Sequence, residues 1–491
     1  MEKRYLLESV MGETRLAVLE DGKLCEMHLD RPGEEKLTGS LYLGRVQNIL
    51  PGMNAAFVDI GLEKNAFLYA GDIPLDSPEI AARVKETRIE RMIRPGQEIL
   101  VQVIKEPGGT KGCRISSHIT IPGRSTVLLP TMSYAGVSKK IADPEERERL
   151  YAIARRISEE NGMGMIARTA AEGADEETLR RDYDRTRALW REIDARARCA
   201  RAPKKIDSGG SLSMRMARDM LDESVCAIEV DGEGLLEETR RYVHALAPQY
   251  ENALRLHTSE TPLFDLYRVD GQMERAMSRL IRMKSGGTLV VDETEALTVI
   301  DVNTGKFVGK KSLDDTIFKL NCEAAAEIAR LIRLRDVGGI IVIDFIDMIL
   351  PEQRETLLNL LREKMKEDRN RTNVVGFTGL GLVEMTRKKV RPPVMKQLMH
   401  QCPTCMGAGI VESHETTARR AIRLLWTRAR QGGQGAYLIE AAPPVAGWIQ
   451  KIGVPDGVRA YLMKMEQPPE GGFRLSPADE RAISGKAIRL K

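Results

Sequence analysis

Aromatic residues, histidines and cysteines are all scarce in this chain of 491 residues. Aromatics make up only 4% of the sequence, so any exposed or paired ring stands out. The 7 cysteines are an odd number and five are isolated, which excludes a disulfide framework and fits a reducing compartment. No apolar run is long enough to cross a bilayer, and the charged N-terminus has no signal-peptide core. We therefore expect a cytoplasmic protein.

A strong overall charge is also missing. The formal net charge of +4 excludes a histone-like protein but leaves room for local basic patches. A composition of 42% hydrophobic and 30% charged residues is typical of a globular protein with real cores. At this length we expect three or four domains rather than one.

Short strands broken by glycine and proline fill residues 41–105, from "LYLGRV" to "EILVQVIKE". Closely spaced strands of this kind predict a small closed barrel. Phe57 and Phe67, two of only 8 phenylalanines, lie on these strands. OB-type barrels stack unpaired bases on such rings and use lysines such as Lys64 or Lys111 on the backbone. The alternative, that both rings belong to the barrel core, stays open.

Two aspartates interrupt otherwise apolar strands: Asp301 in "LTVIDVN" and Asp344 in "IIVIDFID". An apolar stripe from 313 to the glycines at 338–339 predicts a helix between them, so 285–400 reads as an α/β layer with a buried strand. A carboxylate in such a strand is costly unless it is paired or binds a metal. With Asn303 on the same side, and Asp347 just beyond, the pair suits Mg²⁺. The alternative is that each aspartate caps a neighbouring loop or helix.

Two other functions are alternatives to a metal-dependent enzyme. "TGKFVGKKS", residues 304–312, follows a strand as a phosphate-binding P-loop does, which suggests an NTPase. However, Gly305 and Gly309 are one residue too close, and Lys310 is followed by Lys311 rather than a hydroxyl residue. The other alternative is a non-catalytic RNA-binding scaffold. The intact pair of aspartates argues against it, because a scaffold does not need a catalytic metal site.

Basic residues gather after the second aspartate strand. Residues 362–396 hold ten basic side chains, which beside a metal site predict a track for a polyanion rather than only a solvated helix face. The 6 histidines are scattered, and no Ser-His or Cys-His arrangement is visible. This argues against RNA cleavage through the 2′-hydroxyl by histidine acid–base pairs and favours metal-activated water.

Cys402 and Cys405 form a Cys-x-x-Cys pair in "HQCPTCMGAG", half of a closed zinc site of four ligands. Three interpretations are open. The pair could be redox-active, although no thioredoxin-like context surrounds it. Two isolated cysteines could complete it, although their spacing does not match. Or the same pair of a second copy could complete it across a two-fold axis.

Four stretches together resemble the ribonuclease E/G family. "TVIDVNTGKFVGKKSLDDTIFKLNCEAAAEIARLIRLRDVGGIIVIDFIDM" resembles its catalytic core, and "GSLYLGRVQNILPGMNAAFVDIGLEKNAFLYAGDI" its RNA-binding barrel. "GMIARTA" resembles its 5′-monophosphate sensor and "CPTCMGAG" its shared zinc link. The resemblance runs in order from near residue 1 to about 412 and is weak after 415. Without a long scaffold tail, the chain is expected to be closest to the short ribonuclease G type.

The resemblance implies an endoribonuclease specific for single-stranded RNA. It would leave 5′-phosphate and 3′-hydroxyl ends, respond to a 5′-monophosphate, and act in rRNA and mRNA processing and decay. It also selects the two-copy zinc site, and hence a homodimer, while pairing of dimers into a tetramer stays open. The implied site residues are Asp301 and Asp344 for Mg²⁺ with Asn303 beside them, Arg168 and Thr169 for the 5′-phosphate, Phe57, Phe67, Lys111 and Arg371 for RNA, and Cys402 and Cys405 for the structural Zn²⁺ shared between two chains.

The implied fold is a multidomain α/β protein. An RNase H-like domain is expected in two parts, 1–37 and 212–280. It is interrupted by an OB-fold RNA-binding barrel, 38–119, and a 5′-sensor region, 120–211. A DNase I-like catalytic domain, a zinc link and a small C-terminal domain are expected over 281–400, 401–412 and 413–491. The last begins with a basic helix, "RRAIRLLWTRAR", and continues as a loop-rich stretch whose role is open.

Overall fold

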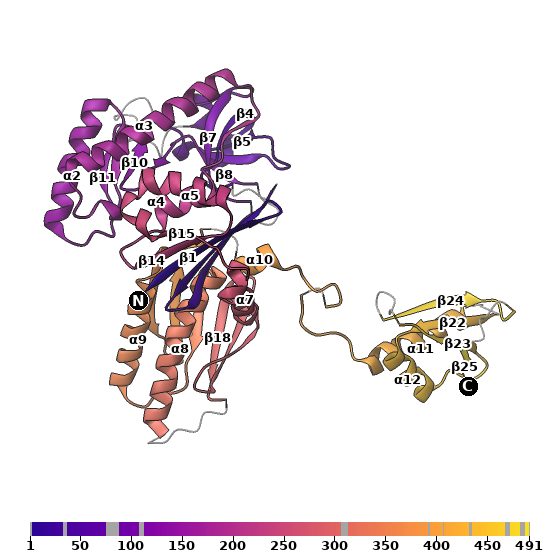
Figure 1. Ribbon diagram of the computed structural model, residues 1–491. Helices are drawn as coiled ribbons and strands as arrows, with labels where there is room; N and C mark the ends of the chain where they lie inside the picture. Colours follow the sequence, from indigo (N-terminus) through magenta and orange to yellow (C-terminus); the bar gives the residue numbers. More distant parts are fainter. Residues whose placement is uncertain are drawn as a thin grey trace. The chain divides into compact units, whose positions relative to one another are not determined.

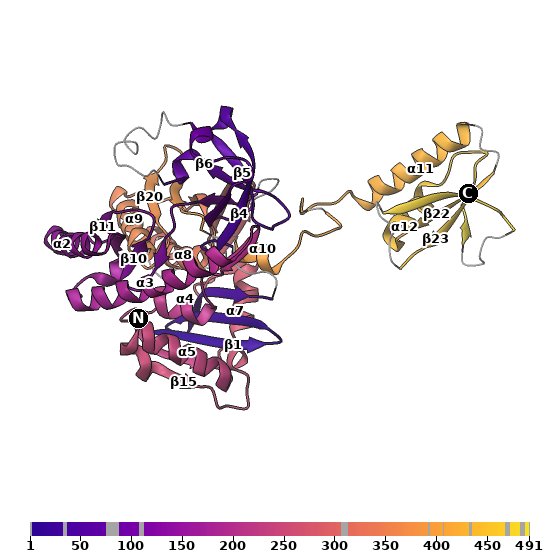
Figure 2. The ribbon, with the colours of Figure 1, turned by 90° about the horizontal axis from the view of Figure 1, so that it is seen from above.

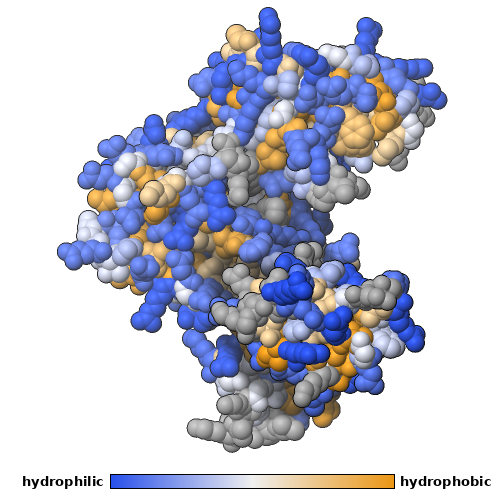
Figure 3. Space-filling model, turned by 90° about the vertical axis from the view of Figure 1, so that its right-hand side faces the viewer, coloured by the Kyte–Doolittle hydropathy of each residue, from blue (hydrophilic) through white to orange (hydrophobic). Residues whose placement is uncertain are grey.

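The computed structural model divides into two compact units, residues 1–398 and 399–491, each of which is described by itself (Figure 1). In the part that the structure describes, no helix is long and apolar enough to span a membrane. The face drawn in Figure 3 is mostly hydrophilic, with apolar residues in small scattered groups. The structure describes residues 2–32, 37–74, 88–107, 112–305, 313–390, 393–405, 407–431, 435–466, 472–481 and 487–490.

A five-stranded sheet joins the N-terminus to a segment more than two hundred residues later, with strand order β15-β14-β1-β2-β3. β1 pairs in parallel with β14, from Lys3 opposite Val225. Because side chains alternate across a strand, Tyr5 and Leu7 pack under α4 and α5, whereas Leu6 joins the core on the other face. The elements are β1 (Lys3–Val10), β2 (Glu13–Glu20), β3 (Lys23–Asp30), β14 (Val225–Val230), β15 (Leu254–Leu256), α4 (Leu212–Asp219) and α5 (Glu233–Leu246).

A five-stranded barrel follows, as the sequence predicts, and its closure is consistent with an OB-like domain. The strands run in the order β4-β5-β6-β8-β7, and β4 also pairs with β7, which closes the ring (Figures 1 and 2). β13 (Lys204–Asp207) pairs antiparallel with the first three residues of β4, Leu41 to Leu43. The barrel strands are β4 (Leu41–Leu50), β5 (Ala55–Asp59), β6 (Ala66–Tyr69), β7 (Glu98–Lys105) and β8 (Arg114–Ser116).

A smaller sheet with the order β11-β12-β10-β9 lies between the barrel and α4 in the chain. Helices α2 and α3 bury apolar faces against it, with Leu150, Ile157, Leu179 and Tyr183 in one core with Met165. Asp143 and Asp175 cap the two helices through their carboxylates. The elements are β9 (Ile121–Pro122), β10 (Thr126–Leu129), β11 (Ala135–Val137), α2 (Pro144–Asn161), β12 (Gly164–Ala167) and α3 (Glu176–Cys199).

The segment from 263 to 398 contains a six-stranded sheet with the order β16-β17-β18-β19-β21-β20, and its core includes buried residues of α8 and α9. The predicted helix between the aspartate strands is confirmed as α8, with Leu320, Ala324, Ile328 and Leu331 buried. The elements are α6 (Leu263–Leu266), α7 (Val269–Met277), β16 (Leu280–Arg282), β17 (Thr288–Glu293), β18 (Leu297–Asn303), α8 (Leu313–Arg335), β19 (Gly339–Asp344), α9 (Pro351–Met365), β20 (Thr372–Phe377), β21 (Val383–Arg387) and α10 (Val394–Leu398).

The prediction of a strand buried on both faces is wrong. In β19, Ile341 and Ile343 are buried, but Ile340 is 51% exposed and Asp344 is also exposed. In the described part of the chain, α8 and α9 pack against the face that carries Ile341 and Ile343, and every second residue of the apolar run points to the other, open face. An unbroken apolar run therefore does not by itself show that both faces are covered.

The C-terminal unit has more regular structure than expected. The basic helix is confirmed as α11, but three strands of at least six residues replace much of the expected loop. β22 and β23 pair in parallel and α12 connects them. The sheet order is β24-β22-β23-β25, and the elements are α11 (His414–Arg430), β22 (Ala436–Ala441), α12 (Pro443–Ile452), β23 (Arg459–Lys464), β24 (Phe473–Ala478) and β25 (Ile488–Arg489).

The domain boundaries drawn from the sequence stay predictions. Strands from the two segments expected to form one domain do share a sheet, because β1 pairs with β14. The RNase H-like and DNase I-like assignments and the zinc link also stay predictions.

Candidate functional site

Asp301 and Asp344 lie side by side on the open face of the six-stranded sheet. β18 and β19 run parallel, and their register places Asp301 directly opposite Asp344. The same register pairs Ile300 with Ile343, both buried on the covered face. Neighbouring strands are about 4.8 Å apart, so the two carboxylates are within reach of one ion.

Asn303 and Asp347 complete this polar cluster. The Asn303 amide nitrogen donates a hydrogen bond to Asp301 Oδ2, 2.7 Å away. This fixes the Asp301 carboxylate and leaves the Asn303 carbonyl oxygen for another ligand. Burial, together with the charges of Asp301 and Asp347, raises the pKa of Asp344 above its ordinary value. The carboxylates therefore repel one another and would gain from a cation between them.

The donor chemistry of this cluster fits Mg²⁺, which commonly uses one or two protein carboxylates and keeps several waters. Among the described residues, no group of three or more His, Cys, Asp and Glu side chains is arranged to hold a metal. A fully enclosed protein cage of the structural-zinc type is therefore not present in that part of the chain. An open site, with Asp344 exposed and Asp301 partly exposed, leaves positions for water and for a substrate phosphate.

The barrel presents its rings outside its own core. Phe57 and Phe67 are register partners on β5 and β6, and their ring centroids are 5.6 Å apart at an interplanar angle of 79°. Both are only partly buried, and neither belongs to the barrel's buried cluster. The alternative that they form the core is therefore wrong. Lys111, the predicted backbone contact, lies outside the described residues.

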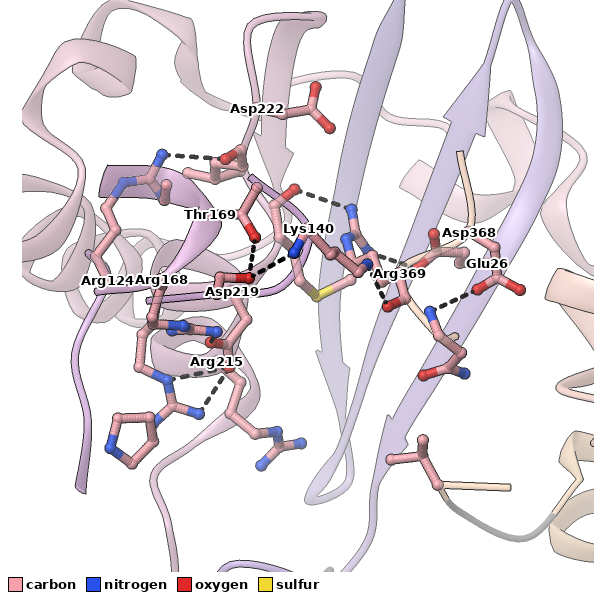
Figure 4. Close-up of a pocket in the computed structure, with 18 of the residues that line it drawn as sticks. Glu26, Arg124, Lys140, Arg168, Thr169, Arg215, Asp219, Asp222, Asp368 and Arg369 are labelled. Carbon is pink, nitrogen blue, oxygen red and sulfur yellow. Dashed lines mark hydrogen bonds and ion pairs between the residues drawn. The ribbon is translucent and has the colours of Figure 1, made fainter. Parts of the chain in front are cut away.

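Arg168 and Thr169 follow β12 and line a cavity of about 900 Å³ (Figure 4). The Arg168 guanidinium donates through Nη1 to the carbonyl oxygen of Gly123 and lies 2.8 Å from Asp219 Oδ1 through Nη2. The Thr169 hydroxyl is 3.0 Å from the Ser138 hydroxyl. These groups are suited to clamp an anion.

The turn that faces Arg168 is built on a buried carboxylate. Asp182 accepts hydrogen bonds from the backbone N–H groups of Ser125, at 2.9 Å, and Thr126, at 2.8 Å. A side chain at position 123 would place its Cβ 2.5 Å from Asp182 Oδ2, so only glycine fits. The turn is thereby fixed with the Gly123 carbonyl toward Arg168.

The cavity is lined from several distant parts of the chain and is rich in cations. Lys140 lies between β11 and α2 and donates to the carbonyl oxygen of Arg369, 3.0 Å away. Arg369 in turn contacts Glu26 of β3, with 2.6 Å between Nη1 and Oε2. The basic lining residues are Arg124, Lys139, Lys140, Arg168, Arg215, Arg218, Arg333, Arg369 and Arg387, against the acids Glu26, Asp219, Asp222, Asp336 and Asp368.

Arg371 does not join the aspartate pair. It immediately precedes β20. The first residue of β20 and Gly339, the first residue of β19, both pair with Arg387 of β21, so the starts of β19 and β20 lie at the same end of the sheet. Asp344 ends β19, so Arg371 lies at the opposite end of the sheet. There it lines a shallow cavity of about 650 Å³ with Lys388.

The predicted basic track is only partly a surface. Arg387 is buried and ion-paired with Asp336, at 2.5 Å, and with Asp368, at 2.6 Å. Arg369 is likewise held by Glu26. These two arginines stabilise the fold rather than forming part of a track. Most of the competing P-loop stretch, residues 306–312 with Lys310, lies outside the described residues.

Cys402 and Cys405 lie in the C-terminal unit, with Cys402 exposed and Cys405 partly buried. Hydrogen bonds from the backbone N–H groups of Cys405 and Thr404 lower the pKa of the Cys402 thiol. A thiolate is the form that binds zinc. Neither cysteine forms a disulfide.

Several residues of these sites were missed from the sequence. Tyr69 extends the pair of rings, 4.5 Å from Phe67, and Arg114 lies 4.7 Å from the Tyr69 centroid. Tyr69 could have been found from the sequence, because Phe67 and Tyr69 are two residues apart on one strand and therefore lie on the same face. Ser138 and Lys140 gave no local signal, since only the fold brings them to Arg168.

Comparisons with known proteins show which proteins this chain resembles. The family model described as "Ribonuclease E/G family" matches residues 120–390. Ribonuclease G of Haemophilus influenzae is 40% identical over 449 residues, which cover 90% of this chain and 91% of that protein. Ribonuclease G of Escherichia coli K12 is 40% identical over 454 residues, 91% of this chain and 92% of that protein. Ribonuclease E of the same strain is 34% identical over 495 residues, 97% of this chain and 46% of that protein.

Proposed function

Because the chain belongs to the ribonuclease E/G family and is an endoribonuclease, we propose that it hydrolyses single-stranded RNA at Asp301 and Asp344 with Mg²⁺. The products would be 5′-phosphate and 3′-hydroxyl ends, in the processing and decay of rRNA and mRNA in the cytoplasm. The observation that carries the proposal is the register of β18 and β19, which sets the two carboxylates beside each other on an open face.

The chain's own residues supply the frame for this reaction. Asp301 and Asp344 hold the ion, and Asn303 orients Asp301 through its 2.7 Å hydrogen bond. Asp347 raises the local negative charge without belonging to the pair. When bound, Mg²⁺ supplies Lewis acidity toward the phosphate and a more acidic water. The open face leaves room for the RNA backbone.

Two further surfaces would guide the substrate. Phe57 and Phe67, partly exposed on the barrel, stack unpaired bases, with Lys111 on the backbone. Arg168 and Thr169 bind a 5′-monophosphate, which stimulates cleavage. Support for this second site comes from its cationic cavity and from the hydroxyl and guanidinium that face it. Arg371 would contact the RNA away from the cut, since it lies at the far end of the sheet.

The finer architecture and assembly follow from the same premise. The sheet formed by β1–β3, β14 and β15 would be the RNase H-like domain, the barrel an OB fold, and the six-stranded layer a DNase I-like domain. Cys402 and Cys405 would bind one Zn²⁺ together with the same pair of a second copy, giving a homodimer, and two dimers could pair further. The two thiols alone leave the zinc site half complete, which supports sharing.

The test is the cleavage rate of a fluorescent single-stranded RNA in Mg²⁺ for Asp301→Asn and Asp344→Asn, each compared with the wild type. Asp292→Asn is the matched control, because it removes a carboxylate from the same sheet at a site paired with Arg279. We expect either active-site variant to lose at least about a hundred-fold in rate, with the control unchanged. Wild-type-like cutting by either variant would overturn the assignment.

A further inference from the structure

Arg168, the arginine proposed to take the terminal phosphate, already has an anionic partner inside its cavity (Figure 4). Its Nη2 lies 2.8 Å from Asp219 Oδ1. We propose that Asp219 is a built-in counter-ion that occupies Arg168 until a 5′-phosphate displaces it, and so limits how tightly the enzyme holds a phosphorylated RNA end. This inference rests on the proposed 5′-phosphate site and adds a residue that regulates it.

The Asp219 contact is close but poorly directed. Asp219 Oδ1 is shielded from solvent and has no hydrogen-bond partner of normal geometry among the described residues. The other oxygen, Oδ2, accepts two well-formed bonds from Arg218, at 3.0 Å from Nε and 2.7 Å from Nη2. The attraction to Arg168 is therefore that of an ion pair without the bidentate geometry that makes arginine–carboxylate contacts strong.

Replacing Asp219 by a phosphate at Arg168 does not leave the Asp219 carboxylate without a cationic partner. When a phosphate binds Arg168, Asp219 keeps its two hydrogen bonds from Arg218, so the carboxylate stays compensated. Burial opposes the charge on Asp219, but Arg218 and Arg168 together hold its pKa below the ordinary value. It therefore remains an anion, and a competitor for Arg168, throughout the neutral pH range.

A terminal phosphate has the charge and the acceptor oxygens needed to displace the Asp219 carboxylate from Arg168. It carries about −1.5 to −2 charges at neutral pH and three acceptor oxygens, against one carboxylate shared between two guanidinium groups. The Thr169 and Ser138 hydroxyls, 3.0 Å apart, can add hydrogen bonds that Asp219 does not receive. A 5′-hydroxyl end has no charge and cannot displace the carboxylate.

The position of Asp219 suits this role. It is the last residue of α4, and Arg124 ties the sensor turn to that helix end by donating to the carbonyl oxygens of Ala217 and Leu221, each at 3.0 Å. The carboxylate is thus held at the cavity wall by the backbone, while its side chain is free to lose one of two partners. Asp222, in the same cavity, is instead paired with Lys3 at 2.6 Å.

The experiment measures binding of a short fluorescent 2′-O-methyl RNA, with either a 5′-monophosphate or a 5′-hydroxyl, to the full chain without added Mg²⁺. For Asp219→Asn we expect the dissociation constant of the phosphorylated RNA to fall roughly five-fold. That of the hydroxyl RNA should not change. Asp222→Asn, the matched loss of a carboxylate, should leave both values unchanged. In an Arg168→Ala background, Asp219→Asn should have no effect.

Unchanged binding of the phosphorylated RNA by Asp219→Asn would overturn the inference. Weaker binding would also overturn it and would mean that Asp219 only positions Arg168. An effect that persists without Arg168 would also overturn it. If the wild type itself binds both RNAs equally, the 5′-phosphate site fails instead, so the two failures are distinguishable. Thermal melting monitors folding, and Asp219→Ser is the second variant should the asparagine variant melt early.

Discussion

Asp301 and Asp344 are register partners on adjacent parallel strands, and both face the open side of the sheet. Asn303 binds the first of them through a 2.7 Å hydrogen bond. Two repelling carboxylates and an orienting amide therefore form a small, exposed anionic site. Its chemistry depends on the alignment of the two carboxylates as much as on their charge.

Asn303→Ala removes the hydrogen bond to Asp301 while leaving both carboxylates in place. We expect kcat on single-stranded RNA to fall by about ten- to a hundred-fold, with KM for RNA little changed. Steady-state kinetics with Mg²⁺ measures both. Asn373→Ala, an exposed asparagine on β20 of the same sheet, is the control. An unchanged kcat would show that Asn303 does not orient the pair.

Phe57→Ala and Phe67→Ala should each weaken RNA binding by about 1–3 kcal/mol, the usual worth of one stacked base. Because both rings lie outside the barrel's buried cluster, the melting temperature should stay close to that of the wild type. Anisotropy with a fluorescent RNA and a thermal melt measure the two effects. Phe67→Tyr keeps a ring and should bind normally. A large loss of stability with unchanged RNA affinity would mean that the rings serve the fold.

Glu26 of β3 forms ion pairs with Arg333 of α8 and with Arg369, and these pairs make the stability of the fold depend on acid pH. Burial opposes its charge, but Arg369, His28 and Arg333 more than offset this and hold the pKa of Glu26 well below its ordinary value. A carboxyl with a lowered folded pKa contributes stability above its unfolded pKa of about 4.3, and that contribution is lost as the pH falls through the folded value.

Glu26→Gln should therefore lower the free energy of unfolding at pH 7 by about 3–5 kcal/mol, the typical cost of breaking a buried pair. The difference from the wild type should shrink in strong acid, where Glu26 is protonated. Urea unfolding across the acid range measures it. A difference that is equally large at pH 7 and in strong acid would mean that the charge of Glu26 is not what stabilises the contact.

Cys402→Ser should lose zinc and shift the protein from dimer toward monomer, because one missing thiolate per chain leaves half of the proposed four-ligand site. Metal analysis and light scattering report the two outcomes. Cys199→Ser, at another exposed cysteine, is the control and should keep both zinc and dimer. A Cys402 variant that remains a zinc-bound dimer would rule out the shared site.

The aspartate site could be predicted from the sequence because its signal is local. Asp344 ends one apolar strand and Asp301 lies two residues before the end of another. The stripe of Leu320, Ala324 and Ile328 between them predicts the connecting helix that makes the strands parallel. Parallel neighbours bring their carboxyl ends together, which is what the register shows. The barrel followed in the same way from short strands with glycine corners.

Other features could not be predicted, because they depend on contacts between distant segments. An apolar strand does not show which of its faces is covered, so Ile340 was expected to be buried and is exposed. Arg371 and Arg387 look alike in sequence, yet one is exposed and the other lies in a buried ion pair. The two partners of Arg168 are far away in the chain, because Asp219 ends a helix some fifty residues later and Gly123 lies in a turn 45 residues earlier.

The central claim is that water, activated by a metal at Asp301 and Asp344, cuts the RNA. The most direct measurement is the chemical mapping of both ends of the fragments made from a defined single-stranded RNA, in Mg²⁺ and in EDTA, by the wild type and by Asp344→Asn. We expect 5′-phosphate and 3′-hydroxyl ends, formed by the wild type in Mg²⁺ only. Fragments ending in 2′,3′-cyclic phosphate, or the same fragments from Asp344→Asn at the wild-type rate, would contradict it.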